Sequence, residues 1–311
     1  MANWIEKKSE IIYGNKAKSE RMDINKDIDL FIADTMEKQL KIKSDFQNLF
    51  LHVFQKSLDG IQWEHFYLNC PYGQTVSFVY YHKNIMIAHG GLIPQKLLSR
   101  EGREYDYYLQ TAIMIEEEHR NLHIFKKLMD EIHQYVVERN AFDLAFPNDK
   151  SYLPFIKLLE WQNVMEYNIY QYVLTDDCAS LDQYYKDTER DFTYSLNLDD
   201  EFLKWRGELN HLKVFEEEGC KVVYKDYEGA LELLDVSVRK RGIRVSVSEI
   251  TDSLGYSKVN IPECFFNMLD LKGLSLLGTV GIPQRMCLFP SSIDRVEYKE
   301  IKPSLLLSDV F

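Results

Sequence analysis

The sequence lacks paired cysteines and long apolar runs, and each absence excludes a class of protein. Its five cysteines are scattered singly, at Cys70, Cys178, Cys220, Cys264 and Cys287. Without a Cys-x-x-Cys pair they favour reduced thiols in a cytosolic protein over a disulfide framework. No stretch approaches the roughly 18 uninterrupted apolar residues of a membrane span, and the N-terminus lacks the apolar core of a signal peptide. We therefore expect a cytoplasmic protein without membrane insertion.

Several catalytic patterns and an excess of positive charge are also missing. The chain carries no Gly-x-Ser-x-Gly elbow, no Ser/His/Asp order and no P-loop, so the sequence gives no support for a hydrolase or a P-loop nucleotidase. Lys and Arg number 37 against 49 Asp and Glu, a net charge of -12. This charge repels a nucleic-acid backbone, so we expect no nucleic-acid partner.

The residues that are present suit a globular protein of two lobes. Hydrophobic residues make up 45% of the 311 residues and include 20 Tyr, 17 Phe and 4 Trp, which is ample for packed cores. Domains usually contain roughly 100 to 200 residues, so the length favours two. We expect an N-terminal arm over 1–26, a first domain over 27–176 and a second over 193–311, joined by an acidic connection between Thr175 and Thr193.

Hydrophobic periodicity predicts a mixed α/β order in the first domain. The expected elements are a helix over about 46–54, strands over 75–82, 84–93 and 107–115, a helix over 122–139, a strand over 141–146, a helix over 151–159 and a strand over 162–174. This order implies a mixed sheet with a right-handed parallel crossover around residues 120–140. In the second domain we expect a strand over 220–224, a turn over 226–229, a helix over 230–240 and an apolar segment over 265–277 that ends at Gly278.

The stretch Tyr107–Phe146 is the most informative for function. A strand there leads into the loop Glu118–Phe125 and then into an amphipathic helix, with Arg120 where the helix begins. The N-terminus of a helix offers unpaired backbone N–H groups and the positive end of a dipole, so it suits an anionic cofactor. The pattern indicates a ligand of the coenzyme A type.

These residues also resemble a known family. The run Ile115–Phe125, followed by Phe146-Pro147-Asn148 and by Leu158–Trp161, is similar to the GNAT N-acyltransferase superfamily, in particular to two-lobed members associated with bacterial surface-polysaccharide sugars. The resemblance covers about residues 27–174, whereas Phe202–Arg206 and Leu307–Phe311 are only loosely similar to the second lobe. It implies an α/β fold in which a GNAT-like N-terminal lobe precedes a second, degenerate GNAT-like lobe.

The resemblance further implies an acyl-CoA, most simply acetyl-CoA, as co-substrate. The main chain near Ile115 would pair with the pantetheine arm, and a run of backbone N–H groups would hold the pyrophosphate. These groups belong to Arg120, Asn121, Leu122, His123, Ile124 and Phe125. In the family this loop has the form Arg/Gln-x-x-Gly-x-Gly/Ala, and here His123 and Phe125 replace the glycines. The alternative interpretation is an ordinary start of a helix.

The catalytic groups of the family are replaced as well. The expected Glu falls near Leu109 and the expected Tyr falls at Ile156. Nearby polar groups that could orient an amine or a relay water are Glu104, Asp106, Tyr108, Gln110 and Tyr152, each of which also suits a surface or core position. Asn148 directly follows a strand end, where ligands gather in open α/β sheets, but it equally suits a helix N-cap. We nominate Tyr108, Gln110 and Asn148.

A metal site is the weaker interpretation of the same loop. His119 and His123 lie four residues apart, beside Glu118, as metal ligands on one face of a helix do. Catalytic zinc needs three protein ligands, and spacing supplies no third. We therefore predict no metal.

The leading hypothesis is thus an N-acyltransferase that moves an acyl group from acyl-CoA to a small-molecule amine, with an amino sugar as one acceptor class. One alternative is a catalytically degenerate GNAT-like protein that binds a ligand or partner. Another is amino-acid transfer from aminoacyl-tRNA by a tandem protein of the Fem type, to which the acidic charge is an objection. The sequence leaves the oligomeric state open.

Overall fold

A computed structural model describes residues 28–175, 193–217, 219–238, 244–289 and 301–307. The predicted arm over 1–26 and most of the predicted connection after Thr175 lie outside these residues. The chain divides into two compact units. Unit 1 contains residues up to Gln95 together with Tyr108–Asp143, and unit 2 contains Lys96–Tyr107 together with the chain from Leu144 onwards.

The sheet of unit 1 has the strand order β1-β2-β3-β4. Its strands are β1 (Ile28–Ala33), β2 (Val76–His82), β3 (Ile85–Ser99) and β4 (Glu104–Ile115), and β3 and β4 each continue into unit 2. The predicted hairpin is confirmed, because β2 and β3 pair in antiparallel register up to His82 and Ile85. Lys83 and Asn84 between them both have positive φ, 52° and 63°, as a two-residue hairpin turn requires. Strand β1 was missed by the sequence prediction.

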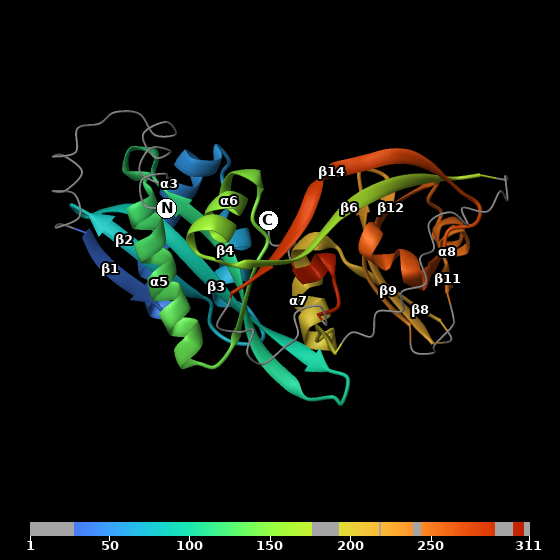
Figure 1. The fold of residues 1–311 in the computed structure, drawn as a ribbon, viewed down its shortest axis with the longest axis horizontal. Coiled ribbons are helices and arrows are strands. Elements are labelled where there is room, and N and C mark those ends of the chain that lie inside the picture. Colours follow the sequence, from blue (N-terminus) through green and yellow to red (C-terminus); the bar gives the residue numbers. More distant parts are fainter. Residues whose placement is uncertain (1–27, 176–192, 218, 239–243, 290–300, 308–311) are drawn as a thin grey trace. The chain divides into compact units, whose positions relative to one another are not determined.

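Helices cover both faces of this sheet (Figure 1). They are α3 (Met36–Phe54) and α4 (Gly60–Leu68) on one face and α5 (Leu122–Glu138) on the other. Neighbouring residues of β3 show the two faces. The His89 ring lies 4.7 Å from the ring of Phe46 on α3, whereas a Cβ added to Gly90 would lie 2.7 Å from Cδ1 of Ile132 on α5. The predicted helix over 122–139 is confirmed, the one over 46–54 is the second half of the longer α3, and α4 was not predicted.

An apolar stripe on one face explains why α5 forms and packs on the sheet. Phe125, Met129, Ile132 and Val136 are all buried at helical spacing. The helix ends before Asn140, whose φ of 56° is the left-handed conformation predicted for its cap. The next strand, β5 (Phe142–Ala145), contributes residues to both units.

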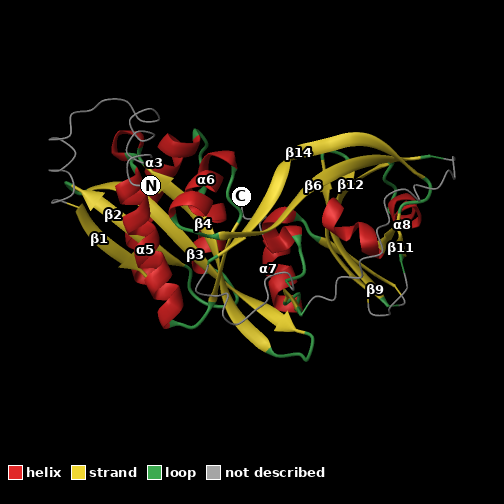
Figure 2. Ribbon diagram, viewed as in Figure 1, coloured by secondary structure: helices red, strands yellow, loops and turns green. Residues whose placement is uncertain are grey.

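Unit 2 is built on a long antiparallel pair, β6 (Gln162–Leu174) and β14 (Leu274–Leu288), which run side by side in Figure 2. The strand order is β14-β6-β12-β10-β9-β8, and the end of β5 pairs with β14. The further strands are β7 (Tyr194–Leu196), β8 (Lys213–Glu217), β9 (Cys220–Tyr227), β10 (Ala230–Val238), β11 (Val245–Ser246), β12 (Lys258–Pro262) and β13 (Leu269–Asp270). Because β10 is parallel to β12 and antiparallel to β9, the sheet is mixed.

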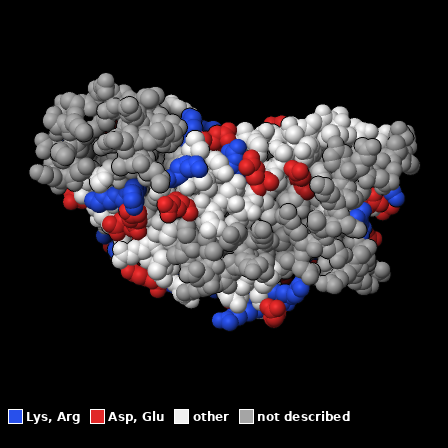
Figure 3. All heavy atoms as spheres, viewed as in Figure 1, with Lys and Arg blue, Asp and Glu red and all other residues white. Residues whose placement is uncertain are grey.

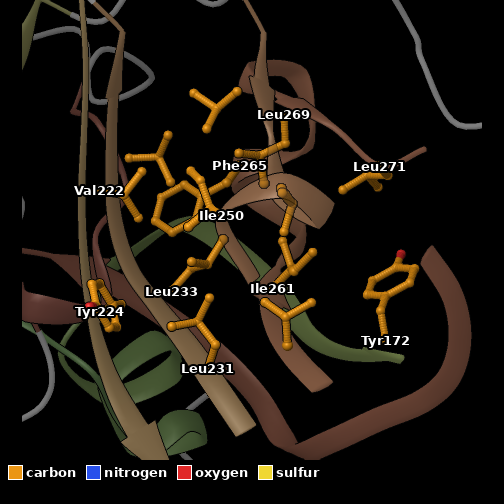
Figure 4. Close-up of a cluster of buried hydrophobic side chains, with 14 of the residues drawn as sticks. Tyr172, Val222, Tyr224, Leu231, Leu233, Ile250, Ile261, Phe265, Leu269 and Leu271 are labelled. Carbon is orange, nitrogen blue, oxygen red and sulfur yellow. The ribbon is translucent and has the colours of Figure 1, made fainter. Parts of the chain in front are cut away.

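The helices of unit 2 cap and cover this sheet. They are α6 (Asp149–Leu158), α7 (Asp200–Asn210), α8 (Val247–Ser253) and the 3₁₀ turns η3 (Glu263–Met268) and η6 (Leu305–Leu307). The core between strands, α8 and η3 contains Val222, Leu233, Ile250, Ile261 and Phe265, which point toward one another in Figure 4. Burial of such side chains contributes roughly 1.5 to 3 kcal/mol each, which is the main stabilisation of this unit.

Two sequence predictions for unit 2 were wrong. Residues 230–240 were expected to form a helix, but Ala230–Val238 is strand β10, buried without interruption as far as Val236. A short apolar run has no diagnostic period, and here the turn decides, because Glu228 and Gly229 have positive φ and fold β10 back on β9. The apolar segment expected to end at Gly278 instead divides into η3, β13 and β14, and β14 passes through Gly278.

The segment 301–307 is buried within unit 2 and contains a charged residue, Lys302. Lys302 Nζ donates to Asp235 Oδ1 at 2.6 Å, and the two side chains are only 10% and 3% exposed. The fully buried Arg206 donates from Nη2 to the Leu306 carbonyl at 2.8 Å. These bonds fasten the segment to β10 and α7.

Charges elsewhere are mixed in sign. On the face seen in Figure 3, the Lys and Arg side chains of described residues lie among Asp and Glu side chains. Several form ion pairs, such as Lys126 with Asp130 at 2.8 Å and Lys96 with Asp106 at 2.6 Å. Among the described residues no helix is long and apolar enough to cross a membrane.

Candidate functional site

The carboxyl half of β4 contains a strained residue. Ala112 has φ of 46°, and it is the one non-glycine residue with positive φ inside a strand of the described chain. This region of φ is disfavoured for residues with a Cβ, and such outliers gather at functional sites. Ala112 and Ile113 are partly exposed, whereas Thr111 and Met114 beside them are buried. The strand is therefore both distorted and accessible at this point.

A buried histidine contacts the distorted residue. His89 Nδ1 lies 2.8 Å from the Ala112 carbonyl oxygen, and His89 Nε2 lies 3.1 Å from Ser77 Oγ. Since a carbonyl only accepts, Nδ1 carries the proton and Nε2 accepts from the Ser77 hydroxyl. Burial lowers the His89 pKa to about 4, so the ring is neutral at physiological pH. Gln39 lies beside Ser77, with its Nε2 3.1 Å and its Oε1 3.2 Å from Ser77 Oγ, while Nε2 donates to the carbonyls of Ala33 and Thr75 at 2.8 Å.

In the loop after β4, the Glu116 carboxylate bonds to residues of the same loop. Glu116 Oε2 accepts from the Glu118 N–H at 2.8 Å and lies 3.2 Å from His119 Nδ1, at the single turn η1 (Glu117–His119). Burial raises the pKa of the Glu116 carboxyl, but the bonds from His119 and the Glu118 N–H outweigh it, so that pKa lies below its ordinary value. The loop is thus ordered without glycine.

The N-terminus of α5 offers two backbone donors. Asn121 is the N-cap, and its Oδ1 accepts from the Ile124 N–H at 2.9 Å. The Phe125 N–H donates to the Asn121 carbonyl. Within the described residues the N–H groups of Leu122 and His123 make no hydrogen bond. An anion bound there could accept from these two groups and would be favoured by the helix dipole.

The other predicted cofactor residues occupy different environments. Arg120 precedes the helix rather than opening it, and its Nη2 donates to the Ile115 carbonyl at 3.3 Å. His123 is exposed, whereas Ile124 and Phe125 are 1% and 9% exposed and belong to the core face of α5. Phe125 at the position of a family glycine is therefore explained by packing.

Gln110, nominated for catalysis, is held by an acid that the sequence analysis did not single out. Its Nε2 donates to Asp143 Oδ2 of β5 at 2.7 Å. Asp143 is fully buried, and burial raises its pKa well above the ordinary value although the bond from Gln110 lowers it. Gln110 Oε1 and Asp143 Oδ1 have no hydrogen-bond partner in the described structure. A protonated Asp143 satisfies this surrounding best, because the neutral acid avoids a buried charge.

Tyr108 and Asn148 have other neighbours. The Tyr108 ring lies 5.9 Å from the ring of Tyr135 on α5, on the face of β4 that Gln110 shares. Asn148 belongs to unit 2, where it is the N-cap of α6 and accepts from the N–H groups of Lys150 and Ser151. Its structural interpretation as an N-cap is thus confirmed.

The histidines of the loop form a different pair from the predicted one. His119 Nε2 lies 3.1 Å from Nδ1 of His82 on β2, while the exposed His123 forms no contact with His119 in the described structure. Among the described residues no group of three His, Cys, Asp or Glu side chains is arranged to hold a metal ion.

The strand, loop and helix of unit 1 and the mixed sheet define the fold of the GCN5-related N-acetyltransferases, or GNAT fold. No protein-family profile matches the sequence, and no curated protein matches it. Three solved structures, each aligned with a probability of 1.00, show the likeness.

A GCN5-related N-acetyltransferase from Kribbella flavida aligns with TM-score 0.57 and 12% identity over 85% of this chain and 71% of its own. A conserved protein of unknown function from Enterococcus faecalis V583, described as a probable N-acyltransferase, aligns with TM-score 0.57 and 10% identity over 84% and 72%. Eis1 from Mycobacterium abscessus aligns with TM-score 0.54 and 10% identity over 84% and 72%. At such identities the likeness shows the fold, so the predicted GNAT-like α/β fold is confirmed.

Proposed function

We propose that the protein is an N-acyltransferase whose unit 1 binds an acyl-CoA, most simply acetyl-CoA, and passes the acyl group to an amine. The observation that carries this proposal is the strained, accessible residue Ala112 in β4, followed within one loop by the two unpaired N–H groups of Leu122 and His123. The GNAT fold supports it, because the solved relatives in this fold include named N-acetyltransferases. Fold alone does not imply function, so the site carries the argument.

The residues present fit the anionic part of such a cofactor. Two unpaired donors at the N-terminus of α5 suit a diphosphate, and Arg120 lies two residues before the first of them. The bound cofactor would supply the activated acyl group, and the chain would hold and orient it beside the partly exposed residues Ala112 and Ile113 of β4.

The acceptor is a small-molecule amine, and the resemblance to polysaccharide-associated proteins suggests an amino sugar. Neither nominated side chain of β4 is a free base, because Gln110 is bonded to Asp143 and Tyr108 packs on Tyr135. We therefore propose that positioning supplies most of the rate, with an amine that arrives neutral. A cytoplasmic location and the absence of nucleic-acid partners belong to the same proposal.

A second candidate function is that of a degenerate binding protein. The Glu116 carboxylate already accepts the Glu118 N–H, and Glu117 and Glu118 add two exposed carboxyl groups beside the helix N-terminus. Like charge weakens the attraction of this loop for phosphate. Fem-type transfer from aminoacyl-tRNA is disfavoured further by the net charge of -12.

Calorimetric titration with acetyl-CoA tests the proposal, using wild type, His123→Glu and the matched neutral control His123→Gln. An added carboxylate at the helix N-terminus costs about 1 kcal/mol against a nearby phosphate in a watery setting, so we expect about fivefold weaker binding for His123→Glu alone. A thiol-release assay with glucosamine and other amines then measures transfer. No binding by wild type at millimolar acetyl-CoA would overturn the proposal and favour the degenerate binding protein.

A further inference from the structure

Two histidines of unit 1 meet although they belong to elements that are well separated in the sequence. His82 is the last residue of β2, and His119 is the last residue of the turn η1 in the loop after β4. His82 Nδ1 lies 3.1 Å from His119 Nε2, and the two ring planes form an angle of 66°. The proposed function uses neither side chain, so the pair needs an explanation of its own.

The Glu116 carboxylate fixes which nitrogen of His119 carries a proton. Its Oε2 lies 3.2 Å from His119 Nδ1, and because an ionised carboxylate only accepts, Nδ1 is the donor. In the neutral ring the lone pair of His119 Nε2 therefore faces His82. Histidines that bind a metal almost always donate their other ring N–H to a carboxylate, a carbonyl or water, which orients the ring and raises its basicity.

The spacing of the two facing nitrogens suits one metal ion. Zinc binds an imidazole nitrogen at about 2.0 to 2.1 Å, so two such nitrogens lie about 2.9 Å apart at a right angle and about 3.4 Å apart at the tetrahedral angle. The observed 3.1 Å falls between these values. To bind the ion, the rings must turn until both lone pairs meet at one point, and His82 must carry its proton on Nε2 instead of Nδ1.

An ion can reach the two rings, because neither is fully buried. The side chains of His119 and Glu116 are 17% and 26% exposed, and His82 is partly exposed. Glu117 and Glu118 follow as exposed carboxylates, which attract a cation to this loop. The described residues supply no group of three His, Cys, Asp or Glu ligands, so only two positions around the ion would come from protein.

We propose that His82 Nδ1 and His119 Nε2 bind one divalent transition-metal ion of the zinc class, with Glu116 behind His119 and water in the remaining positions. Imidazole nitrogens suit zinc, nickel and copper, whereas magnesium and calcium prefer oxygen ligands. The ion joins the end of β2 to the loop that leads into α5. It needs no acyl-CoA, so this inference goes beyond the proposed function.

Calorimetric titration of untagged, metal-free protein with zinc chloride tests the inference. We expect one zinc ion per chain, and saturable binding should be lost in His82→Ala and in His119→Ala. Glu116→Gln removes the charge behind His119 and should weaken zinc binding about tenfold. His52→Ala, at an exposed position on α3, is the matched control and should bind zinc like wild type. Magnesium chloride should give no binding.

Nitrogen-15 NMR of the histidine rings provides a readout that does not depend on a variant folding. In wild type, zinc should shift the resonances of His82 Nδ1 and His119 Nε2, while His119 Nδ1 keeps its proton. No binding by wild type at millimolar zinc, or unchanged ring resonances, would overturn the inference. Zinc binding that survives either alanine substitution would place the ion elsewhere and overturn it too. In each of these cases the proposed function would stand.

Discussion

Asp143→Asn should stabilise the protein increasingly as the pH rises. Asp143 is fully buried, its one hydrogen bond comes from Gln110, and its pKa is raised by burial. An asparagine has nearly the same shape, can accept from Gln110 Nε2 through its oxygen, and can donate to the unpartnered Gln110 Oε1. The variant therefore keeps the packing and removes only the titration.

Proton linkage gives the direction in which the free energy of unfolding changes with pH. An acid whose pKa is higher in the folded than in the unfolded state leaves the folded state with more bound protons, so stability falls as the pH rises from the unfolded pKa toward the folded one. Each pH unit in this window costs about 1.4 kcal/mol. Between pH 4.5 and 5.5 the free energy of unfolding of Asp143→Asn should thus gain about 1.4 kcal/mol relative to wild type, and the gain should continue until the folded pKa is reached.

Urea denaturation followed by circular dichroism at a series of pH values measures this difference directly. Asp130→Asn, at an exposed position on α5, controls for the loss of one surface carboxylate. Parallel pH profiles for wild type and Asp143→Asn would show that Asp143 is not held neutral, and the description of the Gln110–Asp143 pair would have to be abandoned.

Two further predictions concern packing and buried charge. Lys302→Met leaves the Asp235 carboxylate buried without its cation and should lower the free energy of unfolding by about 3 to 5 kcal/mol, whereas Lys302→Met with Asp235→Leu should recover most of it. Chemical denaturation measures both free energies of unfolding, and an equal loss of stability in the single and the double variant would contradict this account. Gly90→Ala should cost about 1 to 3 kcal/mol because its Cβ would meet Ile132 Cδ1. Adding Ile132→Val removes that atom, so a double variant no better than the sum of the two single ones would refute the clash.

Local sequence patterns were enough to predict many of the helices and strands of unit 1. Helix α5 has a regular apolar stripe and an asparagine at its end, and the β2–β3 turn contains Lys83-Asn84, so each element is determined by neighbouring residues. The N-terminus of α5 was likewise predicted close to its true start, although Arg120 lies before the helix and Asn121 caps it. Signals that act within one or two turns of chain are readable from sequence.

Long-range partners explain what was missed. Residues 230–238 read as a helix in isolation, and only pairing with β9 and β12 makes them a strand. Gln110 was singled out as a polar residue in a strand, but its partner Asp143 lies 33 residues further along. His89 gave no sequence signal at all, because its meaning depends on the conformation of Ala112, 23 residues away. An acidic residue inside a short apolar strand was the one available hint of Asp143.

The fastening of segment 301–307 has a consequence for how the protein is made. Arg206 finds its carbonyl acceptor 100 residues later in the chain, and Asp235 finds its cation 67 residues later. On the ribosome, the Asp235 carboxylate must therefore wait for its cation, and Arg206 for this acceptor, until Lys302 and Leu306 have left the exit tunnel. Contacts of such separation are slow to form, so nascent chains halted before residue 301 should depend on chaperones in a way that the completed polypeptide does not.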